Sequence, residues 1–552
     1  MMAGLHEEIE CLLSDLEFKN IKIHNKKISC DIFVEEHALS FECVLPDAFP
    51  YVFPIISVYG ENIESLPHIN DDNNICTFDA NKAFPNWKEP VKIIVESMKQ
   101  ALNVIKEGML KENCEEYIEE FNAYWHRECD FICESIFDPG EVVKVIKCCS
   151  VDGKIYIAQN AEDLDEFLYK IGKQKIFNIK YTDCLYIPLS SPIYPPFSYS
   201  NLDFFKIMQK ETKHYIRYND FLRKHLPNKA VIAFSLPSNR ESIQIFIHSE
   251  VSIPNGFRKG CKSNILWPTF VYQKDIYRIP PKKGFVQNVS HKRLFYRGGV
   301  GVLKLIDKVL IIGCGSVGSY LVEAISEYGV RKFILVDKEK LSVENIARHY
   351  CGYEDVGRSK VVSIKTKLIK HNPNVECNCF EKDGNIFIEE CNNEIMNSDI
   401  IFLATANTPL EYHVIEKLKS ISFNKPLVII WVEPFLLAGH ALIINRYDDN
   451  IFEKMFDESF GFKNKVVIDG DQYLKKESGC QSTFMPYSAF SLKQFIYSFL
   501  NYLINENIAK NKDGNYHVTW IGNINSVSEL GVKFSDKYMQ ERPYEIVIKR
   551  FD

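Results

Sequence analysis

A glycine-containing turn between a buried strand and a helix constrains the fold of this chain more than any other feature. The apolar run Lys308–Ile312 is followed by the sequence GCGSVG at residues 313–318, and an amphipathic helix is predicted over Ser319–Glu327. Glycines in such a turn let the backbone bend tightly and approach a phosphate held at the helix N-terminus. From about residue 292 onward, strands and helices alternate, which predicts a doubly wound parallel sheet of the Rossmann-like type.

An acidic residue after the next strand supports a nucleotide site at this turn. The predicted strand Lys332–Val336 ends in Asp337, which follows Gly315 by 22 residues, near the spacing of a carboxylate that binds ribose hydroxyls. We therefore predict that Gly313, Gly315 and Gly318 face a bound nucleotide. The glycine motif alone suits NAD as well as ATP, and a turn with only a structural role is a further alternative.

The polar residues beyond Asp337 favour ATP over NAD. They are Glu339, Asn345, Arg348 and Lys360, which lie within 23 residues of the aspartate. Cations and an amide gathered in one place suit a triphosphate better than a dinucleotide. Each of these residues by itself is more simply explained as a solvated charge, so the prediction rests on the set.

The same segments resemble the ThiF/MoeB and ubiquitin-activating adenylation domains over about residues 292–552. The resemblance is carried by Gly313–Gly318, Asp337, Glu344–Arg348 and Asp355–Lys360. It implies that Asp337 holds the ribose of ATP. It also implies that Asn345, Arg348 and Lys360 grip the phosphates while a protein's C-terminal carboxylate attacks the α-phosphate, forming an acyl-adenylate and pyrophosphate.

The resemblance also implies Mg²⁺ as a second cofactor and a homodimer, with Arg297 as the candidate to reach the nucleotide of the partner subunit. One position departs from the family pattern. The family's next strand usually ends in a metal-associated aspartate, but Ala406 occupies that place in the stretch Asp399–Asn407. Magnesium is then held by another group or by phosphates and water alone, or adenylation is weakened. The paired CxxC motifs of many relatives are absent, so we expect no structural zinc and no protein metal site.

A candidate nucleophile lies in the polar segment Glu477–Tyr487, ahead of a helix predicted over Ser488–Tyr502. Within it, Cys480 follows a glycine and precedes the helix N-terminus, where the pKa of a thiol can be lowered. Most of the 17 cysteines are expected to be packing residues. The segment also resembles the catalytic cysteine loop of activating enzymes, which makes Cys480 the expected thioester-forming residue.

A second candidate nucleophile, Cys76, lies in the first 137 residues. His68 precedes it by eight residues and Asn70 by six. This spacing resembles the ubiquitin-conjugating fold, in which a His-Pro-Asn tripeptide stands at these offsets from the catalytic cysteine; here Ile69 replaces the proline. The resemblance implies that His68 organises the loop and that the Asn70 amide stabilises an oxyanion. The alternative is that both residues only cap a turn around a core cysteine.

Length and composition are consistent with a multidomain α/β protein. The chain has 552 residues, 46% of them hydrophobic and 25% charged, and we predict three domains: a conjugating-like α+β domain over residues 1–137, a β-rich middle region over 138–290 without a chemical motif, and the adenylation domain over 291–552. A net charge of −7 argues against nucleic-acid binding. No secretory or membrane-spanning segment is apparent, so we expect a cytoplasmic protein with reduced thiols.

This order of modules resembles the fused conjugating–activating enzymes of bacterial anti-phage CBASS operons. By that resemblance, the activated protein is the CD-NTase, the operon's cyclic-nucleotide synthase, which passes as a thioester from Cys480 to Cys76 and then to a lysine or another amine. The nearest alternative is the same chemistry with a separate ubiquitin-like modifier. Sulfur-carrier activation, a nicotinamide dehydrogenase and a non-catalytic scaffold are further alternatives.

Overall fold

The computed structural model describes residues 2–61, 63, 66–70, 72–78, 82–110, 118, 121–173, 179–193, 199–211, 213–225, 228–238, 242–248, 280–296, 306–448, 450–476, 483–505, 514–525, 531–538 and 540–551. The chain forms two compact units. The first contains residues 1–165 and 175–293, and the second contains residues 166–174 and 294–552. Among the described helices, none combines the length and the apolar character needed to cross a membrane.

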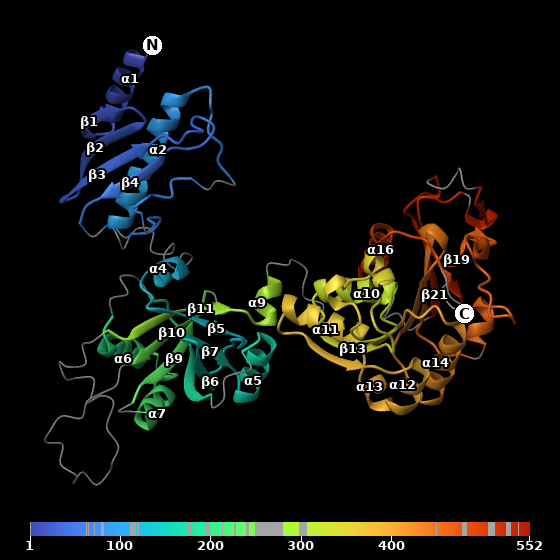
Figure 1. The fold of residues 1–552 in the computed structure, drawn as a ribbon. Coiled ribbons are helices and arrows are strands. Elements are labelled where there is room, and N and C mark those ends of the chain that lie inside the picture. Colours follow the sequence, from blue (N-terminus) through green and yellow to red (C-terminus); the bar gives the residue numbers. More distant parts are fainter. Residues whose placement is uncertain are drawn as a thin grey trace, which may run out of the picture. The chain divides into compact units, whose positions relative to one another are not determined.

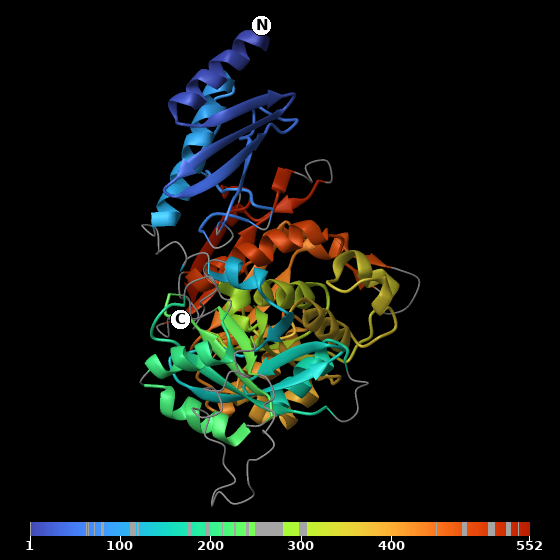
Figure 2. The same ribbon diagram turned by 90° about the vertical axis from the view of Figure 1, so that its left-hand side faces the viewer.

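The first unit begins with an antiparallel four-stranded sheet covered by helices on one face (Figures 1 and 2). Its elements are α1 (Met2–Asp15), β1 (Lys19–His24), β2 (Lys27–Val34), β3 (His37–Val44), β4 (Ile55–Tyr59) and α2 (Pro90–Leu110). In β2 the residues alternate in burial, so that Ile28, Cys30 and Ile32 point into the core. Leu13 of α1 and Met98 of α2 pack on that face. The predicted conjugating-like α+β module is therefore present.

The first unit continues with a closed seven-stranded barrel in the order β10-β11-β5-β7-β6-β8-β9. Its elements are α4 (Phe121–Arg127), β5 (Phe131–Ser135), β6 (Lys144–Val151), β7 (Lys154–Ala158), β8 (Thr182–Pro188), α6 (Asn201–Lys210), α7 (Tyr215–His225), β9 (Ala230–Ser235), β10 (Ile243–His248) and β11 (Lys282–Asn288). Helices α5 (Ala161–Lys170) and α9 (His291–Tyr296) each have residues in both units. The middle region is thus rich in strands, as the sequence predicts. Because the barrel is closed, it has no unpaired edge strand.

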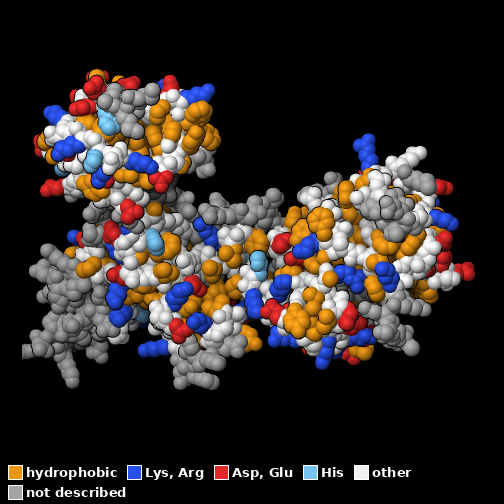
Figure 3. Space-filling view, turned by 45° about the horizontal axis from the view of Figure 1, so that its top comes forward, with side chains coloured by type: hydrophobic (Ala, Val, Ile, Leu, Met, Phe, Trp, Pro, Cys, Tyr) orange, Lys and Arg blue, Asp and Glu red, His pale blue; other side chains and the backbone are white. Residues whose placement is uncertain are grey.

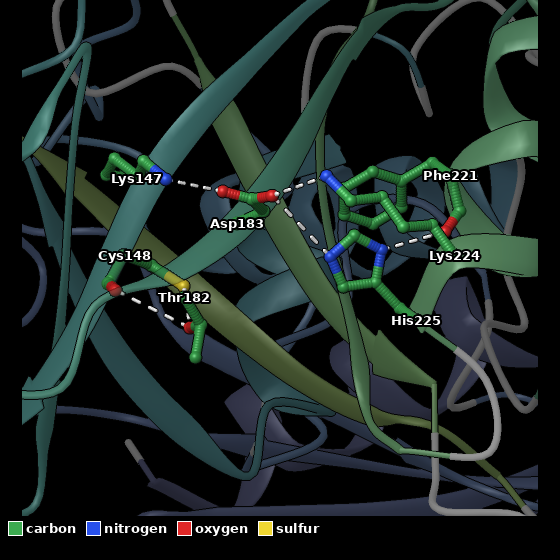
Figure 4. A network of polar contacts seen from close by, with 7 residues as sticks. All are labelled: Lys147, Cys148, Thr182, Asp183, Phe221, Lys224 and His225. Carbon is green, nitrogen blue, oxygen red and sulfur yellow. Dashed lines mark hydrogen bonds and ion pairs between the residues drawn. The ribbon is translucent and has the colours of Figure 1, made fainter.

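A charged network fastens α7 to the wall of the barrel (Figure 4). The carboxylate of Asp183 on β8 lies 2.6 Å from the ammonium of Lys147 on β6. It also lies 3.5 Å from Lys224 Nζ and 3.7 Å from His225 Nε2, both on α7. The hydrogen bond from Lys147 is the main cause of the lowered pKa of Asp183. One carboxylate therefore joins two strands and a helix.

The second unit is built on an eight-stranded sheet in the order β14-β13-β12-β15-β16-β17-β21-β23 (Figure 1). Its strands are β12 (Lys308–Ile312), β13 (Lys332–Val336), β14 (Glu376–Phe380), β15 (Ile400–Leu403), β16 (Leu427–Val432), β17 (Ala438–Ile444), β21 (Asn515–Ile521) and β23 (Ile546–Phe551). Two short pairs lie outside this sheet: β18 (Val467–Ile468) with β22 (Lys533–Phe534), and β19 (Lys475–Lys476) with β20 (Thr483–Phe484). Its helices are α10 (Ser316–Glu327), α11 (Lys360–His371), α12 (Gly384–Glu390), α13 (Asn392–Met396), α14 (Thr408–Ser420), α15 (Ile451–Met455) and α16 (Ala489–Asn505).

Both faces of this sheet are covered by helices. Val309 and Ile311 of β12 pack with α10, α11 and α16, whereas Leu310 and Ile312 pack with α12 and α14 on the other face. Strands β14, β13, β12, β15 and β16 are parallel, as the strand–helix alternation predicts. The last three strands are antiparallel. The short turn over residues 433–437 between β16 and β17 explains this change, because a parallel pair needs a long crossover.

Candidate functional site

The carboxyl ends of β12, β13 and β15 enclose a cavity of about 210 Å³. Strand β12 lies between β13 and β15, so the chain leaves it toward one side of the sheet and later returns on the other. Ligands of open α/β sheets bind at such a switch point. Four of the predicted residues line the cavity: Gly313, Gly315, Asp337 and Lys360.

Glycine occupies each of the three predicted positions for a different structural reason. Gly313 has a φ of +90°, and a Cβ placed there would lie 2.6 Å from the carbonyl oxygen of Ala404. A Cβ on Gly318 would lie 1.9 Å from the carbonyl oxygen of Gly313, so only glycine allows the helix to approach the turn this closely. Gly315 is the N-cap of α10 and has open space around its Cβ position. The N-terminal amides of α10 are thereby open to an anion.

Asp337 organises the turn through backbone hydrogen bonds. Its carboxylate accepts a hydrogen bond from the amide of Cys314 at 2.8 Å and another from the amide of Glu339 at 2.8 Å. The side chain therefore lies between the glycine turn and the loop after β13. A carboxylate held in this way at the mouth of the cavity is suited to accept hydrogen bonds from ribose hydroxyls.

Charges of both signs alternate around the cavity. The buried ammonium of Lys360 lies 2.5 Å from Glu339, and Lys338 lies 2.8 Å from Asp383. Lys382 lines the same cavity. Three ammonium groups in this place can neutralise phosphate charge, and the loop after β14 that supplies Lys382 and Asp383 was not singled out from the sequence. Its position at the carboxyl end of a parallel strand is the signal that could have found it.

Asn345 and Arg348 are not among the residues that line the cavity. The Asn345 side chain accepts hydrogen bonds from the amide and hydroxyl of Ser342 at 3.0 and 3.2 Å, which closes a capping box on a short 3-10 helix. Arg348 donates to the carbonyl of Met485 at 2.7 Å, and its guanidinium lies 5.0 Å from the ring centre of Tyr487. In this structure Arg348 is therefore bound to the segment that follows Cys480.

His349 was missed by the sequence analysis, although it directly follows Arg348. Its Nε2 lies 2.9 Å from the carbonyl oxygen of Cys314, and its Nδ1 accepts from the amide of Cys351 at 3.0 Å. Burial lowers the pKa of His349 to about 4, so the ring is neutral and carries its proton on Nε2. The imidazole thus links the glycine turn to the loop of Arg348.

The loop after β15 contains Ala406 in the left-handed region, with a φ of +48°. Beneath it, the buried carboxylate of Glu411 accepts hydrogen bonds from the Thr405 hydroxyl at 3.1 Å and the Asn407 amide at 3.3 Å. Burial raises the pKa of Glu411 to about 7. Thr405 and Asn407 line the cavity, so this carboxylate supports its floor.

Cys480 and Arg297 lie outside the described residues. The described segments on either side of residues 477–482 pair as a short antiparallel ladder, in which Lys475 faces Phe484 and Lys476 faces Thr483. The amide of Phe435 donates to the carbonyl of Pro486 at 2.9 Å. Met485 and Pro486 are therefore held by Arg348 and by the turn between β16 and β17.

The second candidate nucleophile, Cys76, lies in the first unit and is exposed. Its amide donates to the carbonyl of His68 at 2.7 Å, and Ile69 and Ile75 form an antiparallel bridge. The predicted residues His68 and Asn70 are therefore brought beside the cysteine. The Oδ1 of Asn70 accepts from the amide of Asn74 at 2.8 Å. That oxygen stabilises the turn, while the amide nitrogen lies on the other side of the same planar group.

The thiols differ strongly in exposure. Of the cysteines in the described part of the chain, Cys11 and Cys76 are exposed, Cys129 and Cys379 are half-buried, and the others are buried. Burial raises the pKa of Cys351 to about 12, as it does for several others. Cys76 is therefore set apart from the packing cysteines by its surroundings.

Aromatic side chains in the segments before and after Cys76 in sequence pair with one another. Phe78 stacks on Phe53 with ring centres 4.4 Å apart, and Tyr51 lies 6.0 Å from Trp87. Tyr51, Trp87 and Phe84 are among the exposed large hydrophobic residues of the molecule, and Figure 3 shows apolar side chains gathered on part of this module. Such a surface is typical of protein recognition.

Within the described ranges, no group of three or more His, Cys, Asp or Glu side chains is arranged to hold a metal ion. The cavity nevertheless offers single carboxylates at Asp337, Glu339 and Asp383. Magnesium in nucleotide sites is commonly held by one or two carboxylates together with phosphates and water. The cavity therefore fits magnesium brought by a nucleotide better than a metal site made by the protein alone.

Comparisons with known proteins find two families in the chain. The ThiF family matches residues 294–483, and prokaryotic E2 family B matches residues 4–132. The chain is similar to the ATP-dependent ubiquitin transferase-like protein Cap2 of Pseudomonas aeruginosa (strain BWHPSA011 / Pa011), with 20% identity over 448 residues that cover 79% of this chain and 78% of that protein.

Two further relatives match only the adenylation part. Ubiquitin-like modifier-activating enzyme 5 of Caenorhabditis briggsae is 29% identical over 114 residues, 20% of this chain and 26% of that protein. Adenylyltransferase and sulfurtransferase MOCS3 of Sus scrofa is 35% identical over 106 residues, 18% of this chain and 23% of that protein. The matched part thus spans about a quarter of each of these two proteins. The chain therefore joins a ThiF-type activating segment to an E2-type conjugating segment.

Proposed function

We propose that this chain, an ATP-dependent activating and conjugating enzyme of the ubiquitin-like type, acts on a protein C-terminus in four steps. The carboxylate attacks the α-phosphate of ATP and releases pyrophosphate. The Cys480 thiolate then attacks the acyl-adenylate and releases AMP, and the Cys76 thiolate takes the acyl group by thioester exchange. Finally, an amine attacks the second thioester, loses a proton and frees the Cys76 thiol. The observation that carries this proposal is the presence of both matched segments in one chain.

The geometry of the cavity supports the first step. The same cavity is lined by Gly315 at the open N-terminus of α10, by Lys360 with its ammonium group, and by Asp337 with its carboxylate. Ribose and phosphates can thus be bound at once, and fixed charges around the phosphates stabilise the transition state. Glu339 and Asp383 would be the cavity carboxylates available to a magnesium ion brought by the nucleotide, and the ion would neutralise phosphate charge.

The geometry of the Cys76 turn supports the last step. The carbonyl of His68 is bonded to the amide of Cys76, which fixes the turn against the thiol. Because the Oδ1 of Asn70 is held by the turn, its amide nitrogen is the group that can donate to an oxyanion formed at the thioester. The turn-capping role and the catalytic role of Asn70 are therefore compatible.

For the activated protein, we propose the CD-NTase of an anti-phage CBASS operon, because the chain is similar to Cap2 over most of its length. This proposal includes a cytoplasmic location and a homodimer in which Arg297 reaches the partner's nucleotide. Neither nucleic acid nor a membrane enters it. A separate ubiquitin-like modifier is the second candidate, since relatives named as ubiquitin-like modifier-activating enzymes match the ThiF-type segment. Sulfur-carrier activation gives no role to the conjugating segment.

The test combines intact-mass measurement with non-reducing gels. The full chain is incubated with ATP, magnesium and each candidate protein, as wild type, Cys480→Ala and Cys76→Ala. We expect a thiol-labile adduct that disappears in Cys480→Ala. In Cys76→Ala the adduct should form but never reach an amine. If wild type binds ATP and forms no adduct with any candidate, conjugation is the wrong function and an adenylating or scaffold role replaces it.

A further inference from the structure

Helix α4 follows α2 in sequence, but its aromatic residues pack against the barrel, in an apolar cluster that also contains residues of α6 and α7. The indole Nε1 of Trp125 donates to the carbonyl of Gly284 on β11 at 3.0 Å. Trp125 also packs edge-to-face on Phe204 and Phe234, with ring centres 6.2 and 5.3 Å apart. Trp125 is fully buried. The position of α4 is therefore set by the barrel.

The same helix reaches the turn beside Cys76. The amide of His68 donates to the hydroxyl oxygen of Tyr124 at 2.7 Å, and the guanidinium of Arg127 donates to the carbonyl of Ile69. The guanidinium of Arg127 also lies 5.1 Å from the ring centre of Tyr124, so the two side chains support each other. The Tyr124 ring is buried with the core of the barrel.

These contacts involve the turn that is bonded to the backbone of Cys76. His68 has a φ of +61°, a left-handed conformation that a non-glycine residue adopts only when its surroundings hold it there. Its carbonyl accepts from the amide of Cys76, while its own amide is bonded to Tyr124. His68 is thus bonded to the backbone of Cys76 through its carbonyl and to Tyr124 of α4 through its amide.

We propose that Tyr124 and Arg127 are positioning residues for the conjugation step at Cys76. The barrel then has a function beyond linking two modules, because through α4 it holds the turn His68–Asn70 in the conformation that places the Asn70 amide beside the thioester. The inference rests on the proposed function in one respect, namely that Cys76 carries the acyl group. Small displacements of such groups slow a reaction without abolishing binding.

The test uses the full chain with conservative substitutions. Tyr124→Phe removes only the hydroxyl acceptor, and Arg127→Gln removes the charge. Tyr218→Phe is the matched control for the first, because the buried Tyr218 hydroxyl of α7 is bonded at 2.7 Å to His248 of the barrel strand β10. Arg217→Gln is the control for the second, because Arg217 donates to the carbonyl of Val143 at 3.0 Å. Two rates are measured in each variant. One is the single-turnover discharge of the Cys76 thioester to free lysine, and the other is ATP–pyrophosphate exchange.

We expect discharge at saturating amine to fall about 10-fold in Tyr124→Phe and Arg127→Gln, with the half-saturating amine concentration unchanged. Pyrophosphate exchange should stay within about twofold of wild type, and Arg127→Lys should recover part of the lost rate because it keeps a cationic donor. Discharge within about twofold of wild type in both variants, or an equal loss in the two controls, overturns the inference.

A second measurement separates this inference from the proposed function. Amide hydrogen exchange at His68 and Cys76 should quicken in Tyr124→Phe but not in Tyr218→Phe, whether or not any acyl group is ever loaded. If wild type forms no thioester at Cys76 and exchange still quickens, the proposed function fails while the hold of α4 on the turn stands. Unchanged exchange in Tyr124→Phe overturns the inference regardless of the thioester result.

Discussion

The guanidinium of Arg348 donates a hydrogen bond to the carbonyl of Met485 at 2.7 Å, five residues after Cys480. On the other side, the backbone carbonyl of Arg348 accepts from the hydroxyl of Ser316, in the first turn of the helix that faces the nucleotide cavity. A single residue therefore connects the phosphate end of the cavity with the segment that follows the candidate nucleophile.

We expect Arg348→Lys to impair transfer to Cys480 more than adenylation. Lysine keeps a charge for the phosphates but loses the planar group that lies against the Tyr487 ring. ATP–pyrophosphate exchange should fall less than about 3-fold, whereas the rate of thioester formation at Cys480 should fall about 10-fold. Arg358→Lys is the control, because Arg358 is largely exposed in the same loop region. Equal losses in both steps would contradict the expectation.

Restoring a carboxylate at position 406 should make the adenylation step less demanding of magnesium. The φ of +48° at Ala406 lies in a region that aspartate and asparagine tolerate better than alanine. Ala406→Asp should therefore fold normally and lower the magnesium concentration for half-maximal pyrophosphate exchange by about 3-fold or more.

Ala406→Asn has the same shape without the charge and is the control for that substitution. It should fold normally and leave the magnesium requirement of wild type. An equal shift in both variants would assign the effect to the backbone and not to a metal ligand.

Glu411→Gln should stabilise the second unit at alkaline pH. Because burial raises the pKa of Glu411 to about 7, the folded state binds this proton more tightly than the unfolded state, whose pKa is near 4.5. The free energy of unfolding then falls as pH rises from about 4.5 to 7. Above pH 7 the folded state carries the full free-energy cost of the buried carboxylate charge. Glutamine keeps an acceptor for Thr405 and Asn407 without the charge.

The expected gain for Glu411→Gln is roughly 1–3 kcal/mol at pH 8, shrinking toward zero near pH 5. Amide hydrogen exchange in α14 and β15, compared with wild type at the same pH, measures it. Glu416→Gln on the exposed side of the same helix is the control. A gain that is the same at both pH values would rule out the titration of Glu411 as its cause.

Asp183→Asn should loosen α7 from the barrel. The variant loses the ion pairs with Lys147 and Lys224 and the contact with His225, all partly open to solvent, so we expect a loss of about 0.5–1 kcal/mol at pH 7. The pKa of Asp183 is lowered in the fold, so its contribution is present above the ordinary carboxyl pKa and is lost as pH falls through the folded value.

Amide exchange in α7 and β8 at pH 7 checks the Asp183 prediction. Asp220→Asn on the exposed side of α7 is the control. Protection in α7 that is unchanged in Asp183→Asn would show that apolar packing alone holds the helix.

The nucleotide cavity was largely predictable because its residues lie in one stretch with a fixed strand–turn–helix order. Gly313 and Asp337 could be found from spacing, Lys360 was found as one of a set of polar residues, and all three line one cavity. The contact between Arg348 and Met485 could not be predicted. Met485 lies far along the chain and accepts through its backbone carbonyl, which is common to all residue types.

In the conjugating-like site, too, contacts between residues close in sequence were predictable and contacts with distant residues were not. His68 and Asn70 lie within eight residues of Cys76, and their spacing predicts that they come together. Tyr124 contacts this turn from α4 and packs against the barrel, beside Trp125, whose hydrogen-bond partner lies on β11. Tertiary partners of this kind leave no local periodicity in the sequence.

The uneven burial of the thiols has a consequence for fidelity. An acyl group that moves by thioester exchange can pass only to a sulfur that is both ionised and reachable. In the described part of the chain, Cys30, Cys43, Cys351 and other core cysteines cannot accept the acyl group, because burial raises the pKa of their thiols and makes them unreachable. The fold therefore excludes its buried cysteines as acceptors of an activated acyl group, whereas the exposed Cys11 and Cys76 stay reachable.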